Sequence, residues 1–335
     1  MKKDAVIAIV GATGLVGNEM QNVITDLKIP FKDIKLLASE NSVGELYEIS
    51  SESYPVELLT EDAFNGVDIA LFAVSGKLVE KFVNIASKKG VVCIDNSSFF
   101  RMQKGVPLVV PEVNFNVVKK EDKIISNPNC STIQIIPVLD AINKEAGLKR
   151  VVVSTYQSVS GAGKDALDEL WSQTLAIFNQ RDIEIECFPH QIAFNCIPQI
   201  DLIEDDGYTK EEYKMINETR KILNLPNLPM TATAVRVPVF FSHSESLNVE
   251  TSKELSPKRL IEILSKKEGI VVNDNINEYP MPLDAAGENE VFVGRIRKDF
   301  SVPYGLNMWV VSDNIRKGAA LNAVQILQKI LENME

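Results

Sequence analysis

Hydrophobic positions at the start of the chain alternate between a pattern typical of buried parallel strands and a pattern typical of helices. A continuous apolar run over residues 5–11 precedes a helical spacing of apolar residues that extends to about Leu27. Further apolar runs occupy residues 34–39, 67–74 and 91–95, and a helix is predicted over 77–89. This alternation predicts parallel β-α-β units in a doubly wound sheet, so we expect an α/β Rossmann domain over residues 1–129.

In the second half of the chain, β-rich runs and helical patterns follow one another without a regular order. The predicted strands cover residues 150–158, 231–240, 247–251, 291–295 and 306–312, and the predicted helices cover 164–179, a segment capped by Thr209, and 256–268. A chain of 335 residues is too long for one ordinary hydrophobic core, so we expect two domains. The second, over residues 130–313, is expected to be α+β.

Composition and charge narrow the class of protein. A hydrophobic content of 45% with 24% charged residues is typical of a globular protein, and no apolar run approaches the length of a membrane span. The N-terminus resembles no signal sequence, so we expect a cytoplasmic location and no membrane partner. A net charge of −11 argues against a nucleic-acid partner. Four cysteines without a CxxC pair and only two histidines support neither a disulfide framework nor a metal site.

Cys130 is the strongest candidate for a catalytic residue. It follows a turn that contains Pro128, and a helical pattern begins at the cysteine itself. At a helix N-terminus, the helix dipole and unpaired backbone N–H groups favour the thiolate, which is the nucleophilic form. The ordinary alternative is a buried structural thiol, which fits Cys93 in its apolar run. Polar neighbours on both sides of Cys130 favour the catalytic interpretation.

A glycine-rich turn lies between the first predicted strand and the first predicted helix. Gly11, Gly14 and Gly17 are three residues apart. This spacing permits a tight turn, close approach of a pyrophosphate to the helix N-terminus, and close packing of helix and strand. The required strand and helix flank the turn, so it predicts a dinucleotide site.

Ser-Asn-Pro-Asn-Cys-Ser-Thr at residues 126–132 resembles the active-site motif of the aspartate-β-semialdehyde dehydrogenases. The resemblance continues in Tyr-Gln-Ser-Val-Ser-Gly-Ala-Gly at 156–163, Arg-Val-Pro-Val-Phe-Phe-Ser-His at 236–243 and Asp-Asn-Ile-Arg-Lys-Gly-Ala-Ala at 313–320. These motifs follow the family's order over nearly the whole chain. The resemblance implies a catalytic and dimerisation domain after the Rossmann domain, and a C-terminal helix at about 314–335 that packs back on the first domain.

The resemblance also implies a role for each matching residue. The catalytic set would be Cys130 as nucleophile, His243 for proton transfer, and Gln157. The substrate would be held by Arg236 at its carboxylate, Glu211 at its ammonium group, Lys214 and Arg101 at its phosphate, and Asn129. The residues implied in cofactor binding are Gly11, Thr13, Gly14, Leu15, Val16, Gly17, Ser39, Asn41, Ser42, Ser160, Gly161 and Asn314.

The residues alone leave some of these roles open. Glu211 and Lys214 are three apart, so an exposed ion pair on one helical face is the ordinary explanation. Arg101 could equally be a solvated surface arginine. The pair formed by Arg236 and His243 is more specific, because a guanidinium clamps a carboxylate through two hydrogen bonds and an imidazole titrates near neutral pH.

The expected cofactor is NADP, the family default, but the segment that would select it departs from the family. The family usually has Ser-x-Arg-Ser-x-Gly-Lys here, and this chain has Asn41 and Glu45 at the two basic positions. Ser39, Asn41 and Ser42 could still hydrogen-bond a 2′-phosphate, whereas Glu45 would repel it. NAD, or use of both cofactors, is therefore an alternative.

The implied reaction is reductive dephosphorylation of L-4-aspartyl phosphate to L-aspartate 4-semialdehyde through a cysteine thioester, in amino-acid biosynthesis. The expected partners are this small-molecule substrate, phosphate and further copies of the chain in a homodimer or homotetramer. Related alternatives are an N-acetyl-glutamyl-phosphate reductase and a malonyl-CoA reductase. A nucleotide-binding sensor without chemistry would explain the glycine turn but not the set of Cys130, Arg236 and His243.

Overall fold

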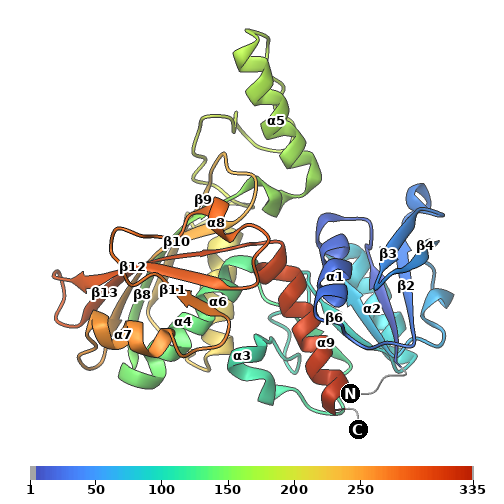
Figure 1. The fold of residues 1–335 in the computed structure, drawn as a ribbon, viewed down its shortest axis with the longest axis horizontal. Coiled ribbons are helices and arrows are strands. Elements are labelled where there is room, and N and C mark those ends of the chain that lie inside the picture. Colours follow the sequence, from blue (N-terminus) through green and yellow to red (C-terminus); the bar gives the residue numbers. More distant parts are fainter. Residues whose placement is uncertain (1–4, 334–335) are drawn as a thin grey trace. The chain divides into compact units, whose positions relative to one another are not determined.

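The computed structural model describes residues 5–333, which lie in two compact units (Figure 1). One unit runs from the N-terminus to Asn129 and takes in the segment from Ala319 onward, and the other runs from Cys130 to Gly318. No helix among the described residues is long and apolar enough to cross a bilayer.

The first unit is built on a mostly parallel sheet. Its elements are β1 (Val6–Val10), α1 (Leu15–Asp26), β2 (Asp33–Ala38), β3 (Leu46–Ile49), β4 (Glu52–Leu58), β5 (Ile69–Phe72), α2 (Gly76–Lys88), β6 (Val92–Asp95), α3 (Pro111–Asn114), β7 (Ile124–Ser126) and α9 (Asn322–Asn333). Within residues 5–333 the sheet has the order β3-β4-β2-β1-β5-β6-β7, with only the edge strand β3 antiparallel. The strand order reverses between β1 and β5, as in a dinucleotide-binding fold, so the predicted Rossmann class is confirmed.

Helices cover both faces of this sheet because β1 is apolar on both sides. Ile7 and Ile9 lie in one buried cluster with side chains of α1 and α9. Ala8 and Val10 lie in a second cluster with side chains of α2. Cys93 also belongs to this second cluster and is fully buried, so its interpretation as a structural thiol is confirmed.

The C-terminal helix α9 is fixed to the first unit by a buried amide network as well as by apolar packing. The Asn322 side-chain amide donates to Asn127 Oδ1 at 2.6 Å and to the carbonyl of Val109 at 2.9 Å. A π-helical segment, Arg316–Leu321, leads into α9. The predicted return of the C-terminal helix to the first domain is therefore confirmed.

The second unit is built on a mixed sheet. Its elements are α4 (Cys130–Ala146), β8 (Leu148–Gln157), α5 (Lys164–Phe178), α6 (Lys210–Ile222), β9 (Met230–Arg236), β10 (His243–Thr251), α7 (Pro257–Leu264), β11 (Ile270–Val272), α8 (Pro282–Ala285), β12 (Val291–Asp299) and β13 (Gly305–Ser312). Among the described residues the strand order is β11-β12-β13-β10-β8-β9. Helices α4, α6 and α7 share one apolar cluster with the strands, while α5 extends away from the sheet of its own unit (Figure 1).

Three predicted strands differ from the structure by several residues at one end, and the one predicted over 291–295 continues to Asp299. The strand predicted over 231–240 ends at Arg236, because Pro238 cannot donate to a β-ladder. The strand predicted over 247–251 begins earlier, at His243, which we expected in the preceding loop. The polar run at its start, His243 to Ser246, concealed the strand because those side chains show no apolar alternation. The β3–β4 hairpin was not predicted at all.

We predict that Asn322→Ala destabilises the first unit by about 2 kcal/mol, because it removes two buried hydrogen bonds and leaves their acceptors unpaired. Thermal or denaturant unfolding measures this change. Lys329→Ala, on an exposed face of the same helix, is the control and should shift the free energy of unfolding by less than about 0.5 kcal/mol. Equal stability of the two variants would show that the amide network does not hold α9.

Candidate active site

Cys130 is the first residue of α4, as predicted, and its side chain is half-buried. Gly318 packs directly against it, because a Cβ built at Gly318 would lie 2.8 Å from the Cys130 Cβ. Two other cysteines are poor nucleophiles: burial raises the pKa of Cys93 to about 12, and partial burial with Glu169 nearby raises that of Cys187 to about 11. Among these thiols, Cys130 alone lies at a helix N-terminus.

The imidazole of His243 is fully buried and held in one tautomer. The backbone N–H of Ser158 donates to Nδ1 at 3.0 Å. An N–H group can only donate, so in the neutral ring Nδ1 is the acceptor and the proton sits on Nε2. Burial, with Arg236 nearby, lowers the pKa of His243 to about 3, which keeps the ring neutral. Nε2 has no protein partner in the structure, so its N–H can serve a ligand.

Asn314 and two serines support this ring from the other side. Ser158 Oγ lies 3.0 Å from His243 Nδ1, and Asn314 Oδ1 accepts from Ser158 Oγ at 3.0 Å and from the Ser242 backbone N–H at 3.0 Å. The Asn314 amide donates to Ser160 Oγ at 3.0 Å. We expected Asn314 and Ser160 to bind the cofactor; in the structure both side chains belong to the network around His243.

Arg236 is the last residue of β9 and is almost fully buried. Its guanidinium donates to the carbonyl of Ser158 at 2.6 Å. Burial lowers its pKa, while the negative charges of Glu211 and Cys130 raise it. A Cβ built at Gly161 would lie 3.1 Å from the Arg236 guanidinium and 3.2 Å from the His243 ring, so glycine at 161 leaves both groups uncovered.

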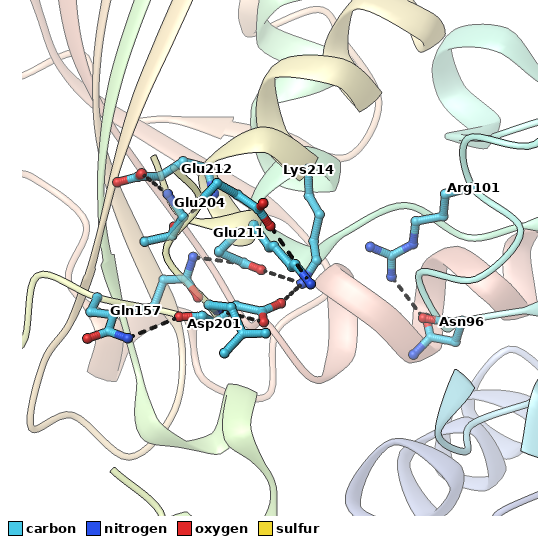
Figure 2. Close-up of polar contacts among 12 residues, drawn as sticks. Asn96, Arg101, Gln157, Asp201, Glu204, Glu211, Glu212 and Lys214 are labelled. Carbon is cyan, nitrogen blue, oxygen red and sulfur yellow. Dashed lines mark hydrogen bonds and ion pairs between the residues drawn. The ribbon is translucent and has the colours of Figure 1, made fainter. Parts of the chain in front are cut away.

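Glu211, Lys214 and Gln157 form a linked group in which the predicted ion pair is real but not exposed (Figure 2). Lys214 Nζ lies 3.0 Å from Glu211 Oε2 and 2.8 Å from Asp201 Oδ2. Gln157 Nε2 donates to Glu211 Oε1 at 3.2 Å and to Ser131 Oγ at 3.0 Å. A carboxylate buried at this position can bind a cation only by competing with Lys214 for its oxygens.

Asp201 was not among the site residues selected from the sequence. Its backbone has a φ of +67°, which is unusual for a residue with a side chain, and its carboxylate reaches Lys214. No local pattern identifies it, because the residue that it contacts is thirteen positions away.

The Rossmann unit holds the remaining candidates. Gly11 has a φ of +84°, and a Cβ there would lie 2.5 Å from the carbonyl of Ala73 at the end of β5. A Cβ at Gly17 would lie 2.0 Å from the Gly11 carbonyl. Gly14 differs, because it is exposed and a Cβ would come no closer than 3.5 Å. Glycine at 11 and 17 is therefore required by packing, whereas at 14 it leaves room for a ligand at the N-terminus of α1.

The segment after β2 is exposed and forms a short helical turn, Glu40–Ser42. Ser42 Oγ donates to Thr13 Oγ1 at 3.4 Å, which connects this turn to the glycine loop. Glu45 accepts from the hydroxyl of Tyr47 at 3.1 Å. The predicted residues Ser39 and Asn41 lie on the surface of the same turn, next to the acidic side chain of Glu40.

Arg101 and Asn129 are buried in the first unit. The guanidinium of Arg101 donates to the carbonyl of Asn96 at 2.8 Å, so Arg101 is not a solvated surface arginine. Asn129 is 7% exposed and directly precedes the nucleophile. Residues 5–333 contain no cluster of three or more His, Cys, Asp or Glu side chains that could hold a metal ion.

The second unit thus brings together a thiol at a helix N-terminus, a neutral imidazole that offers one N–H, and a buried guanidinium. Such a set suits covalent acyl transfer, in which the thiolate attacks a carbonyl carbon and a hydrogen-bond donor stabilises the oxyanion. The guanidinium would orient a carboxylate on the substrate.

Comparison with known proteins identifies the family. The profile described as semialdehyde dehydrogenase, NAD binding domain, matches residues 6–121, and that described as semialdehyde dehydrogenase, dimerisation domain, matches residues 139–317. The aspartate-semialdehyde dehydrogenase of Aquifex aeolicus is 52% identical over 97% of this chain and 98% of its own length. The chain belongs to the aspartate-semialdehyde dehydrogenase family. The family member from Bacillus subtilis is 46% identical over 97% of this chain and 96% of its own.

A solved structure from the aspartate-semialdehyde dehydrogenase family has nearly the same fold. Aspartate semialdehyde dehydrogenase II of Vibrio cholerae, complexed with ASA, is 45% identical and has a TM-score of 0.97 over 99% of each chain. The recognition from sequence motifs is therefore confirmed. The roles assigned to single residues remain proposals and are developed below.

We predict that Gly14→Ala mainly weakens NADPH binding, whereas Gly17→Ala mainly lowers the stability of the first unit. Gly17→Ala should destabilise the first unit strongly, because its Cβ would overlap the Gly11 carbonyl. Gly14→Ala should keep the unfolding temperature but weaken NADPH binding by about tenfold or more, because the methyl group occupies the exposed space beside the helix N-terminus. Calorimetry and fluorescence titration measure the two effects. Unchanged NADPH binding in Gly14→Ala would place the cofactor elsewhere.

Proposed function

We propose that this chain catalyses the reductive dephosphorylation of L-4-aspartyl phosphate to L-aspartate 4-semialdehyde, and the reverse reaction. The observation that carries the proposal is the convergence of Cys130, His243 and Arg236 in one unit of a chain whose fold matches that of a family member complexed with ASA. The catalytic thiol must stay reduced, which supports the expected cytoplasmic location.

The reaction begins with attack of the Cys130 thiolate on the acyl carbon. The carbon–oxygen bond to phosphate then breaks, phosphate leaves, and a thioester remains on the sulfur. A bound nicotinamide cofactor supplies the hydride that reduces this thioester. The resulting hemithioacetal oxyanion collapses to the aldehyde and returns the thiolate, so the sulfur begins and ends the cycle in the same state.

In this scheme, His243 acts as a hydrogen-bond donor. Its Nε2–H stabilises the oxyanion of each tetrahedral intermediate, in the way that a neutral imidazole donor does in other enzymes. Because the nucleophile starts as a thiolate, no step requires the ring to lose its proton completely. The proton consumed in the net reaction ends on the released phosphate. Gln157, held by Glu211 and Ser131, lies beside the same centre and orients the substrate.

Arg236, Glu211 and Lys214 provide substrate recognition. Arg236 would bind the α-carboxylate, and Glu211 would bind the ammonium group by exchanging part of its contact with Lys214. Lys214 would then be available to the phosphate, together with Arg101. This division favours a free amino acid over the N-acetylated substrate of an N-acetyl-glutamyl-phosphate reductase, since an acetylated amine carries no charge for Glu211. A malonyl-CoA reductase would likewise have no use for Glu211.

The cofactor is proposed to be NADP with weak discrimination against NAD. The NAD binding domain profile matches this chain, and the family structure from Candida albicans contains NADP. Asn41 and Glu45, however, offer a 2′-phosphate no positive charge, and Tyr47 already occupies the carboxylate of Glu45.

Self-association through the second unit is proposed as well. The dimerisation domain profile covers residues 139–317. The side chains of Trp171 and Phe178 on α5 are 59% and 73% exposed, whereas Leu170 of the same helix is buried, so α5 presents apolar surface outside the chain's own core. A second copy of the chain is the partner that this surface and the profile support, as a homodimer or homotetramer.

We predict that Cys130→Ala lowers turnover of aspartyl phosphate to less than about a thousandth of the parent rate without unfolding the protein. Steady-state rates in both directions, with circular dichroism on the same samples, measure this. Cys196→Ala removes an exposed thiol outside the site and is the control that should retain activity. Full activity of Cys130→Ala would remove this residue from the mechanism. Turnover of N-acetyl-glutamyl phosphate in preference to aspartyl phosphate would replace the proposed substrate.

We predict that Asn41→Arg raises the ratio of kcat/KM for NADPH over NADH by about tenfold, because a guanidinium pairs with the 2′-phosphate. The ratio is obtained from initial rates with the two cofactors side by side. Asn84→Arg makes the same change of charge on the exposed face of α2 and should leave the ratio unaltered. If the two variants behave alike, position 41 does not contact the adenosine end of the cofactor.

A further inference from the structure

Glu245 is a fully buried carboxyl group that the proposed mechanism does not use. It lies on β10, two residues after His243, and points to the inner face of the sheet, where Leu247 and Val249 continue the same column into the apolar core. Thr155 on β8 and Val310 on β13 are its partners in the sheet register. A polar residue in this column requires a physical reason.

The first turn of α4 faces Glu245. The side chains of Ser131 and Gln134, one and four residues after the nucleophile, lie next to its carboxyl group. Among residues 5–333, neither carboxyl oxygen of Glu245 has a hydrogen-bond partner, and Gln134 Oε1 has none either. Buried polar atoms in native proteins are almost always paired, so unpaired acceptors that lie close together indicate missing protons.

Glu212 shows how this chain pairs a buried glutamate elsewhere. Glu212 lies on α6 and is 7% exposed. One of its oxygens accepts the backbone N–H of Thr209 at 2.7 Å and the other accepts that of Ala234 at 2.9 Å. Glu245 receives no such pair of donors, although it is more deeply buried.

Electrostatics act in the same direction. Burial raises the pKa of Glu245 well above its ordinary value, and the negative charge of Glu211 raises it further. The neighbouring polar side chains of Ser131 and Gln134 lower the pKa but do not offset the burial. His243, on the same strand, is neutral and offers no compensating charge.

We propose that Glu245 works as a neutral carboxylic acid that donates a hydrogen bond to Gln134 Oε1 and thereby holds the first turn of α4, which carries Cys130. Glu245 is thus a positioning residue for the nucleophile. The inference deepens the proposed function and rests on it.

The proton of Glu245 completes a directed chain of hydrogen bonds. Gln157 Nε2 donates to Ser131 Oγ at 3.0 Å, and in the proposed arrangement the Ser131 hydroxyl turns to donate to the carbonyl oxygen of Glu245. Glu245 donates to Gln134 Oε1, and Gln134 Nε2 reaches the backbone carbonyl of His243 at 3.5 Å. In this order every donor meets an acceptor. An ionised Glu245 would instead place carboxylate oxygens against Gln134 Oε1, which also only accepts.

A neutral side chain at position 245 also avoids adding a second negative charge to the site. Glu211 already places one carboxylate near Cys130 and Arg236. A second carboxylate beneath the same helix turn would disfavour the thiolate and repel a phosphorylated substrate. The acid supplies a hydrogen bond without that cost.

Infrared spectroscopy of the whole enzyme tests the protonation state directly. At about pH 8, Asp95, whose pKa burial raises to about 6, is ionised and does not contribute. The parent enzyme should then show the carbonyl stretching band of a protonated carboxylic acid. Glu245→Gln should lose this band, and the matched control Glu212→Gln should keep it. Absence of the band in the parent enzyme, or its survival in Glu245→Gln, overturns the proposal.

Cys130 alkylation by iodoacetamide gives a second test of charge. If Glu245 is neutral, Glu245→Gln keeps the pH midpoint of alkylation within about 0.3 pH units of the parent value. If Glu245 is ionised, removal of its charge lowers the midpoint by about half a unit or more, and the proposal fails.

Positioning is tested by comparing two neutral replacements. Glu245→Gln offers one donor and one acceptor as the acid does, whereas Glu245→Met offers neither. We expect kcat of Glu245→Met to fall at least about tenfold below that of Glu245→Gln, with KM for aspartate semialdehyde within about threefold. Equal kcat values for the two variants contradict the positioning role. The infrared and alkylation tests need no substrate. If the enzyme does not catalyse the proposed reaction, these two tests still report the protonation state of Glu245, so the two failures can be distinguished.

Discussion

The active site depends on a guanidinium that is buried and must be neutralised locally. Arg236 lies at the end of β9 with its charge almost removed from solvent, and the negative charges of Glu211 and Cys130 act on it. A buried cation without such partners would be costly, so the structure stabilises a thiolate and a guanidinium together. Burial, together with the positive charge of Arg236, keeps His243 neutral, so Nε2 remains a donor. The roles proposed for Cys130, Arg236 and His243 therefore depend on one arrangement of charges.

The sheet of the second unit supports this arrangement because its inner face is apolar at one end and polar at the other. Its inner face is apolar at one end, where Leu247 and Val249 pack with α4, α6 and α7. At the other end the same columns carry His243, Glu245 and Gln157, all of them buried. The apolar end provides rigidity, and the polar end projects functional groups from strands whose register is already fixed. Loops would not hold these side chains with the same precision.

Sequence reasoning was most successful where chemistry is local. The strand, glycine turn and helix at the N-terminus, and Cys130 at the start of a helix, follow from periodicity and from contacts between near neighbours. The start of β10 was missed because polar inward-facing residues carry no apolar alternation. Asp201 and Glu245 were missed for a related reason, because each interacts with residues distant in the sequence. Asp201 pairs with Lys214, and Glu245 lies beside the first turn of α4. The sequence motifs identified Lys214 and the start of α4, but they did not predict the contacts of these residues with Asp201 and Glu245.

Gly318 packs against Cys130, and this contact restricts residue 318 for a reason of packing and not of chemistry. The overlap that a side chain at 318 would create involves the Cβ atom of Cys130 and not its sulfur. Every amino acid except glycine has that atom, so replacing the nucleophile does not relieve the restriction. In a descendant that had lost its activity, position 130 could drift freely among small residues while position 318 stayed glycine. Glycine at 318 is therefore required by packing, whereas cysteine at 130 serves only the reaction proposed for its sulfur.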